Sequence, residues 1–284
     1  MTKDKKDKGL FKTQNDYVFK RIFGNENNKD ILIPFLKDVL EFEINEVEIL
    51  NSEITKENLT DKGSLLDVKV KINNNPTVDI EIQVAPTTVM PERSLYYWSK
   101  MYVEDLKSGE DYTKLKKKIC INILNYNHFE TNQYHTKFKI KEDKKHFALT
   151  DMLEIHFIEL PKVVEYNQND KLSAWIIFFN AKNEEELDKV ANLNPAIKKA
   201  VKVVKVMSQD EKEREAYNMR EKALHDIATF IKEGEKIGEK KGETKKAIKV
   251  VKNMLALNAD IDFISKSTEL SIEEILKIKE EMNL

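Results

Sequence analysis

The fold is decided by the stretch from Leu65 to Val84, which reads LLDVKVKINNNPTVDIEIQV. Apolar and polar residues alternate on both sides of its central Asn-Asn-Asn-Pro segment. Alternation with a period of two is typical of β-strands, and a run of asparagines closed by a proline is typical of a turn. The stretch therefore predicts a β-hairpin with strands at 65–72 and 77–84.

The apolar pattern also predicts how the two strands pair. A three-residue loop at 73–75 would place Val68 opposite Ile80, which keeps the apolar residues of both strands on one face. The same register would place Asp67 opposite Glu81 on the polar face, with Cβ atoms roughly 5 Å apart. The hairpin is thus expected to bring two carboxylates together.

Two interpretations of this carboxylate pair stay open on the residues alone. Like charges opposite each other are destabilising unless they are neutralised. A divalent cation would do so, because carboxylate, carbonyl and water oxygens suit Mg²⁺, and a bound metal activates water and stabilises charge on a phosphate. The alternative is that Lys69 pairs with Asp79, while Asp67 and Glu81 are solvated acids compensated by lysines such as Lys71.

The overall charge excludes a uniformly basic nucleic-acid-binding surface, because 48 basic residues oppose 50 acidic ones for a net charge of -2. The charges are nevertheless segregated along the chain. Residues 26–61 are mainly acidic, whereas 107–145 and 198–252 are mainly basic. Such basic blocks permit one phosphate-binding surface, although a solvated face is the simpler interpretation of any single run.

The remaining patterns predict an alternation of helices and strands, which is typical of an α/β or α+β fold. Helices are expected at 13–24, 31–40 and 91–107, strands at 44–50, 118–124 and 153–160, and charged helices from 184 onward. Thr13, with Asp16 three residues later, is the expected N-cap of the first helix.

Composition excludes several further classes of protein. The chain has one cysteine, Cys120, so neither an internal disulfide nor a cysteine zinc cluster is expected. No stretch approaches about 20 apolar residues, so no membrane span is expected, and the polar N-terminus is unlike a signal peptide. A cytoplasmic protein is the resulting expectation. No GxxxxGK[ST] sequence is present, which argues against nucleotide hydrolysis.

Four ordered sequence blocks resemble a known family. Asp67, followed by Asp79-Ile80-Glu81-Ile82-Gln83, resembles the D…ExQ variant of the PD-(D/E)xK nuclease motif. The flanking blocks are DYVFKRIFG at 16–24, RSLYY at 93–97 and SGEDY at 108–112. Together they resemble the recombination-promoting nuclease/putative transposase family over about residues 10–180.

The resemblance implies a metal-dependent DNA endonuclease, associated with recombination or mobile elements. It implies a restriction-endonuclease-like α/β core, a mixed central sheet flanked by helices, followed by an all-α C-terminal extension. Asp67 and Glu81 would ligate Mg²⁺ with help from the Ile82 carbonyl. Gln83 stands where the superfamily usually has a lysine, and glutamine cannot supply a positive charge.

Other side chains are candidates for the missing cation. Arg93, Tyr97 and Lys100 have i, i+4 and i+7 spacing and share one helical face, so Arg93 or Lys100 could reach the phosphate. The alternative is that Arg93 pairs with a nearby acid and Tyr97 packs. Asp16 and Lys20 are candidate contributors from the first helix, although Asp16 could equally stabilise the start of that helix.

Three segments are expected: a disordered tail at 1–9, a nuclease-like domain at 10–230 and a small helical module at 231–284. Gly234, Gly238 and Gly242 predict a weakly structured junction, acting either as a close helix-packing stripe or as a hinge. Ser271 and Glu274 have capping-box spacing in an end that resembles a helix-turn-helix but is too acidic for a DNA groove.

That acidic end favours homo-oligomerisation or regulation through the C-terminal helices. Two functions other than catalysis also stay open. The chain could be a non-catalytic, transposon-derived DNA-binding or oligomerising protein, which the missing lysine favours. It could instead be a regulatory interaction protein in phage or mobile-element conflict, with the nuclease fold as a scaffold.

Overall fold

The computed structural model describes residues 9–50, 68–73 and 75–282. The chain forms two compact units, residues 1–224 and 225–284. The predicted disordered tail lies outside the described residues except for Gly9, and so does the predicted strand start at 65–67, including Asp67.

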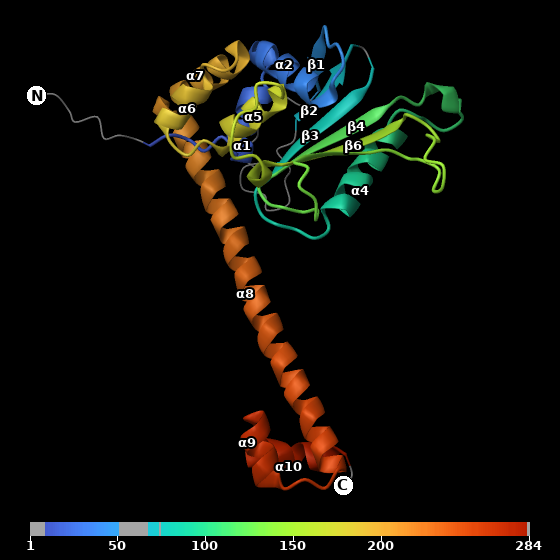
Figure 1. Ribbon diagram of the computed structural model, residues 1–284, viewed down its shortest axis with the longest axis vertical. Coiled ribbons are helices and arrows are strands. Elements are labelled where there is room, and N and C mark those ends of the chain that lie inside the picture. The colour runs from blue at the N-terminus through green and yellow to red at the C-terminus, as the bar shows by residue number, and fades with distance from the viewer. Residues whose placement is uncertain (1–8, 51–67, 74, 283–284) are drawn as a thin grey trace, which may run out of the picture. The chain divides into compact units, whose positions relative to one another are not determined.

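The described residues of the first unit contain one mixed six-stranded sheet, which confirms the predicted fold class (Figure 1). In spatial order the strands are β1 (Val47–Ile49), β2 (Val68–Ile72), β3 (Thr77–Gln83), β4 (Lys118–Leu124), β6 (Leu153–Glu159) and β5 (His135–Phe138). Strands β3, β4 and β6 run parallel, and the β1–β2, β2–β3 and β5–β6 pairs are antiparallel. The four-residue β5 was not predicted, because its side chains are only partly buried or exposed and carry no clear apolar alternation.

The hairpin has the register that its apolar pattern predicts. Val68 pairs with Ile80, and the Ile72 N–H donates to the Pro76 carbonyl at 2.9 Å. The turn closes where the Asn75 N–H donates to the Ile72 carbonyl at 2.7 Å. The next predicted pair, Asp67 with Glu81, includes a residue outside the described range.

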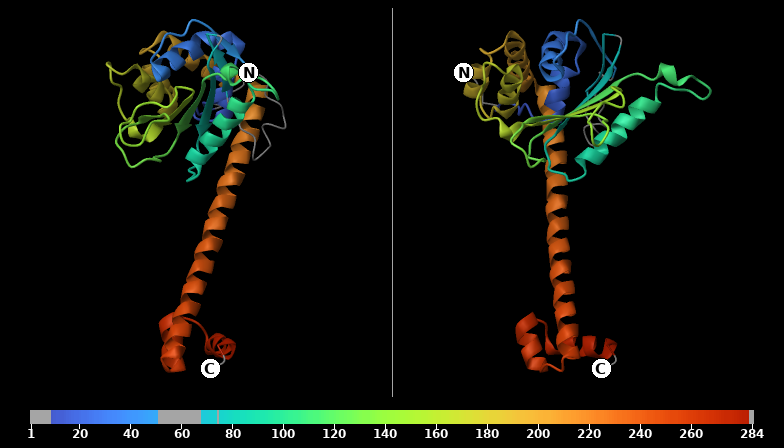
Figure 2. Two further views of the ribbon diagram at one scale, coloured as in Figure 1. Left: turned by 90° about the vertical axis from the view of Figure 1, so that its right-hand side faces the viewer. Right: turned by 45° about the vertical axis from the view of Figure 1, so that its right-hand side comes forward.

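Helices cover both faces of the sheet (Figure 2). The helices of the first unit are α1 (Asp16–Phe23), α2 (Lys29–Leu40), α4 (Met90–Val103), α5 (Lys171–Asn180), α6 (Glu184–Val190) and α7 (Pro195–Gln209), with 3₁₀ turns η1 (Glu26–Asn28), η2 (Tyr112–Lys114) and η3 (Leu160–Lys162). Side chains of α1, α2, α5 and α7 share one large core with the sheet. Methionines of α4 form a second core on the other face.

The N-cap of α1 differs from the prediction. The cap is Asn15, whose side-chain oxygen accepts from the Tyr17 and Val18 N–H groups. Thr13 is instead buried, and its hydroxyl lies 2.9 Å from the Phe179 carbonyl. The hydroxyl therefore ties the chain to the end of α5, a long-range contact that local capping rules do not include.

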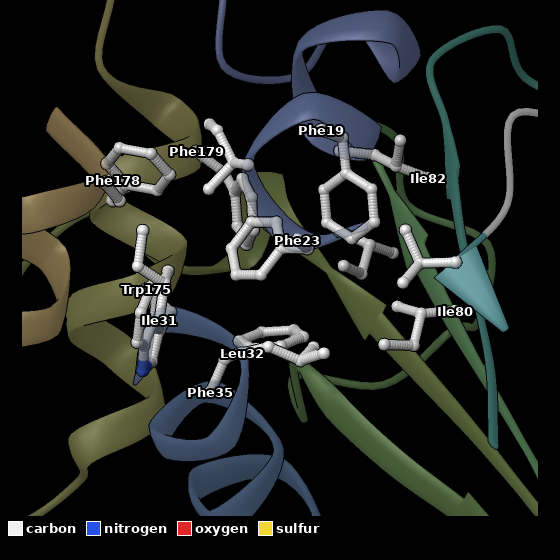
Figure 3. Packing of buried hydrophobic residues seen from close by; sticks show 14 of the residues in the cluster. Phe19, Phe23, Ile31, Leu32, Phe35, Ile80, Ile82, Trp175, Phe178 and Phe179 are labelled. Atoms are coloured by element: carbon white, nitrogen blue, oxygen red, sulfur yellow. The ribbon is translucent and has the colours of Figure 1, made fainter. Parts of the chain in front are cut away.

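The larger core is an aromatic cluster that faces the apolar side of the hairpin (Figure 3). The Phe23 ring centroid lies 4.7 Å from that of Phe19, 5.0 Å from Phe35 and 5.9 Å from Trp175. Tilted and edge-on aromatic pairs contribute about 0.5–1.5 kcal/mol each beyond their buried area. Ile80 packs in this core. Because successive side chains of a strand point to opposite faces, the polar residues of β3 point to the other face, which α4 covers.

Strand β3 is buried on both faces, whereas its alternation predicted a half-buried strand. Asp79 is 9% exposed and Glu81 is 5% exposed. The burial follows from α4, which packs over the polar face of the sheet (Figure 2). A carboxylate in such a place needs a partner, because burying an unpaired charge is costly.

A second buried polar cluster lies at the β5–β6 edge. His156 is fully buried, with Nε2 at 2.8 Å from a Glu154 carboxylate oxygen and Nδ1 at 2.8 Å from His135 Nε2. Lys117 and Lys139 pair with the other Glu154 oxygen at 2.8 and 3.1 Å. Burial lowers the pKa of both histidines, that of His135 to about 4.

This cluster predicts acid sensitivity. The unfolded state binds a proton on His135 below its ordinary pKa of about 6.5, whereas the folded state does so only below about 4. The free energy of unfolding should therefore fall by about 2–3 kcal/mol as the pH drops from 7 to 4. Urea unfolding across this range measures the slope. His135→Gln should flatten it, and an equally steep slope in that variant would refute the assignment.

The second unit is helical. Helix α8 (Glu211–Ala256) crosses the boundary between the units and is followed by α9 (Ile261–Thr268) and α10 (Ile272–Glu281). Their core contains Val251, Leu255, Ile264, Ile275 and Ile278. The capping box predicted at Ser271 and Glu274 is present. Within the described residues, no helix combines the length and apolarity that crossing a membrane requires.

The junction predicted at Gly234, Gly238 and Gly242 is not weakly structured. All three glycines lie inside α8, which is one uninterrupted helix (Figure 2). Each interior glycine costs a helix about 1 kcal/mol relative to alanine. The glutamates and lysines between them are good helix formers, which explains why glycine spacing alone gave the wrong prediction.

Candidate active site on the face of the sheet covered by α4

Strand geometry brings the candidate residues of the hairpin onto one face. Asp79, Glu81 and Gln83 alternate along β3 and point to the same side of the sheet. On β4 they pair with Cys120, Asn122 and Leu124. Burial, with the charges of Asp79 and Glu81 close by, raises the pKa of the Cys120 thiol well above its usual range. Two carboxylates therefore lie over the middle of the sheet.

Arg93 neutralises one of these carboxylates. Its Nη2 lies 2.5 Å from the Glu81 Oε1. The Glu81 side chain is 7% exposed and that of Arg93 is 30% exposed, so the pair spans from the interior to the solvent. Charge-assisted hydrogen bonds of this kind are roughly twice as strong as neutral ones. The alternative in which Arg93 pairs with a nearby acid is thus what the structure shows.

Tyr97 and Lys100, the other two residues predicted on this helical face, lie in different surroundings. The Arg93 guanidinium carbon lies 5.9 Å from the centre of the half-buried Tyr97 ring, an arrangement that holds the cation over an aromatic face. The Lys100 ammonium lies 5.1 Å from the Tyr96 ring centre and is exposed. Arg93 and Tyr97 therefore stay candidates for the site at Glu81, whereas Lys100 lies at the surface.

Asn122 connects α4 to the sheet by hydrogen bonds beside the Arg93–Glu81 ion pair. Its Oδ1 accepts from the Ser94 hydroxyl at 3.0 Å, and its Nδ2 donates to the His156 carbonyl at 3.0 Å. Asn122 is 2% exposed. Sequence reasoning missed it, although a single amide within the apolar run 118–124 was a usable signal.

Tyr126 is a second residue that sequence reasoning missed. Its hydroxyl is buried just beyond the end of β4. Burial raises the pKa of Tyr126, and the negative charge of Glu81 adds to the effect. No local pattern marks this tyrosine, because only the fold brings it near Glu81.

Gln83 ends β3 at the edge of this face. Its side-chain nitrogen donates to the Ala85 carbonyl at 3.0 Å. This bond fixes the amide orientation, so that the side-chain oxygen is an acceptor and the group carries no charge. Gln83 can orient a water or a phosphate, but the positive charge must come from another residue.

Asp16 and Lys20 lie on α1, on the opposite face of the sheet. Arg220 of α8 holds the Asp16 carboxylate, with its Nε 2.9 Å from both oxygens and its Nη2 bonded to Oδ2. Lys20 is 4% exposed. A Cβ on Gly24 would lie 3.1 Å from the Lys20 side chain and 3.5 Å from that of Val68, so Lys20 packs close to the start of β2.

The described residues include two of the three predicted metal ligands. They contain no group of three His, Cys, Asp or Glu side chains arranged to hold a metal ion. Of the three predicted ligands, the Glu81 carboxylate and the Ile82 carbonyl are described, and both are the hard oxygen donors that Mg²⁺ prefers. Asp67 lies outside the described range. The donors fit a divalent cation in chemical type.

One comparison with known proteins gave a match. A family model described as PD-(D/E)XK nuclease family transposase matches residues 13–234. The match covers α1, the hairpin and α4, and it ends inside α8. No curated protein and no solved structure matches the chain.

Proposed function

Since the chain belongs to the PD-(D/E)XK nuclease transposase family, we propose that it is a metal-dependent DNA endonuclease that hydrolyses phosphodiester bonds at the α4-covered face. One observation supports this most directly. The predicted metal ligand Glu81 is buried on that face, and a guanidinium that is partly open to solvent holds it. The arrangement combines a negative site for a cation with a positive group for a phosphate.

Asp67, Glu81 and the Ile82 carbonyl would hold the cation. When bound, a divalent cation supplies an activated water and neutralises charge on the phosphate. Asp67 directly precedes Val68, which pairs with Ile80 beside Glu81. In sequence, the two proposed carboxylate ligands are thus direct neighbours of the two residues of one observed hairpin pair.

Arg93 takes the role that a lysine has elsewhere in the superfamily. A guanidinium carries five N–H donors in a fixed fork, so Arg93 can hold Glu81 through Nη2 and still donate to a phosphate oxygen. Tyr97 orients the guanidinium by lying against it. Gln83 orients the attacking water by accepting a hydrogen bond from it through its side-chain oxygen, because its nitrogen already donates to the Ala85 carbonyl.

Lys100, Lys20 and Asp16 have supporting roles. Lys100 is exposed on α4 and would contact the DNA backbone away from the scissile phosphate, a contact that adds affinity but no sequence information. Lys20 is buried on α1, where it would support the start of β2. Asp16 anchors Arg220, and we assign it a structural role.

A non-catalytic function is the second candidate. It is favoured by Gln83, which carries no charge, and by Arg93, which already forms an ion pair with the proposed metal ligand Glu81. In that case the chain would bind DNA or regulate a partner without cleaving DNA, in recombination or in conflict with mobile elements. Self-association through the C-terminal helices suits either function.

One assay separates the two candidates. The wild-type chain is incubated with supercoiled plasmid in Mg²⁺, in Mn²⁺ and in EDTA, beside Asp67→Asn. We expect nicking in metal only, lowered at least about 100-fold in Asp67→Asn because the site loses a charged ligand. A gel-shift assay in Ca²⁺ should show that both proteins bind DNA. Binding without nicking by the wild type in any metal would favour the non-catalytic function.

A further inference from the structure

The middle of α8 exposes apolar side chains. Every residue from 231 to 246 is exposed in the described structure. Ile231 is 46% exposed and Ile237 is 56% exposed. Most of the stability of a helix in a protein comes from packing one face against a partner. This segment also carries the three glycines, which weaken an isolated helix.

Three apolar residues of α8, Ile227, Phe230 and Ile237, have the spacing of a coiled coil. Steps of three and four residues connect Ile227, Phe230, Gly234, Ile237, Lys241 and Thr244. Residues separated by such steps occupy the a and d positions of a heptad repeat, and these positions form the contact line, or seam, between two helices. The seam continues as Ile248, Val251 and Leu255, which are already packed in the core of the second unit. The part of the seam outside that core is thus limited to about 227–244, where Ile227 is partly buried and the later positions are exposed.

We propose that this segment of α8 pairs with the same segment of a second copy of the chain, as an antiparallel two-helix coiled coil. The two-fold axis would pass between Glu235 and Lys236. Residue 234 of one copy then faces residue 237 of the other, and residue 227 faces residue 244. This proposal does not depend on catalysis at the α4-covered face.

Shape complementarity favours this register. Ile237 of one copy lies on Gly234 of the other, and Ile231 lies beside Gly238. Glycine has no side chain, so both isoleucines meet a small residue and the backbones can approach closely at these two contacts. In a parallel register Gly234 would instead meet its own copy and leave a gap in the seam, and gaps reduce packing energy.

Charge complementarity selects the same orientation. In the antiparallel register Glu233 of each copy lies beside Lys240 of the other, which gives two ion pairs by symmetry. In the parallel register Lys241 would meet its own copy in the seam, and Lys240 would lie beside Lys245. Residues that flank the seam set helix orientation in coiled coils, and only the antiparallel arrangement avoids these like-charge contacts.

The association is tested by light scattering on the full-length chain. We expect twice the chain mass for the wild type and one chain mass for Ile237→Asp, which places a charge in the seam. Glu239→Lys is the matched control, because position 239 points away from the seam, and it should remain a dimer. A monomeric wild type up to its solubility limit would overturn the proposal.

The orientation is tested by oxidative cross-linking. In the antiparallel register Ile227→Cys alone should not cross-link, because the two copies of residue 227 are 17 residues apart along the axis, about 26 Å. A disulfide requires Cα atoms roughly 4–7 Å apart. Ile227→Cys combined with Thr244→Cys should give a covalent dimer. The wild type is the oxidation control, since its one cysteine, Cys120, is buried.

The cross-linking result stands even if Ile237→Asp fails to fold. A covalent dimer from Ile227→Cys alone would indicate a parallel pair and refute the register. No cross-link from either variant would refute the proposal. Neither experiment measures DNA cleavage, so a failure here is distinguishable from a failure of the proposed nuclease function.

Discussion

Glutamine in place of Glu81 is expected to abolish metal-dependent plasmid nicking, with a rate loss of about 10³-fold or more. Glutamine keeps the size of the side chain and removes its charge, and a metal ligand of this kind accounts for several kcal/mol of transition-state stabilisation. Nicking rates with enzyme in excess over plasmid measure the loss. Circular dichroism confirms that the variant is folded, which we expect because Arg93 is partly exposed and can be hydrated.

The matched control is Asp79→Asn. Asp79 lies two residues earlier on the same strand and the same face, and at 9% exposure it is nearly as buried as Glu81. It should lose no more than about tenfold in rate, which corresponds to about 1.4 kcal/mol. A severe loss in Asp79→Asn combined with an active Glu81→Gln would move the ligand assignment from Glu81 to Asp79.

A double variant distinguishes a metal ligand from a residue that only positions Arg93. If Glu81 acts solely by holding Arg93, then adding Glu81→Gln to Arg93→Gln should lower the nicking rate no further. If Glu81 holds the cation, the loss in Glu81→Gln exceeds that in Arg93→Gln, and raising the Mg²⁺ concentration reverses part of it. Double-mutant cycles isolate such pairwise coupling when the residues are in contact.

Methionine in place of Arg220 is expected to destabilise the first unit by about 3–5 kcal/mol. Arg220 is 4% exposed and holds the Asp16 carboxylate, which is 8% exposed. Removing one partner of a buried ion pair leaves an uncompensated charge in the interior, which costs far more than the pair contributes. Urea unfolding measures the change. Lys222→Met, at an exposed position of the same helix, should stay within about 0.5 kcal/mol of the wild type.

The double variant Asp16→Asn/Arg220→Met tests the origin of this loss. It removes both charges, and buried ion pairs replaced as a whole are often nearly neutral for stability, so much of the lost stability should return. If the double variant is folded and still nicks DNA, Asp16 is structural. Regained stability without nicking would instead assign Asp16 to the catalytic site.

The hairpin could be predicted because its information is local. Alternating valines and isoleucines fix which side of each strand is apolar, and a one-residue shift would expose all of them. The register from Val68 to Ile80 follows from that constraint alone. Helix α4 could be placed for a similar reason, because Pro91 is favoured in a first helical turn.

Features that depend on distant contacts could not be predicted in this way. Strand β5 is a short edge strand whose place is set by β6. Tyr126 is buried near Glu81 only through the fold, and the Thr13 hydroxyl finds its partner at the end of α5. The glycines of α8 suggested a break in the helix, since helix propensity is a weak prior that the surrounding residues can override.

The sequence by itself determined the hairpin, its register and the acids that face one side of it, because these follow from periodicity within a few residues. Only the tertiary structure decided which cation neutralises which acid. Arg93 is 12 residues from Glu81 in sequence, and Arg220 is 204 residues from Asp16. Charge pairing depends on distance and burial in space, and those are set when α4 and the start of α8 pack within the first unit.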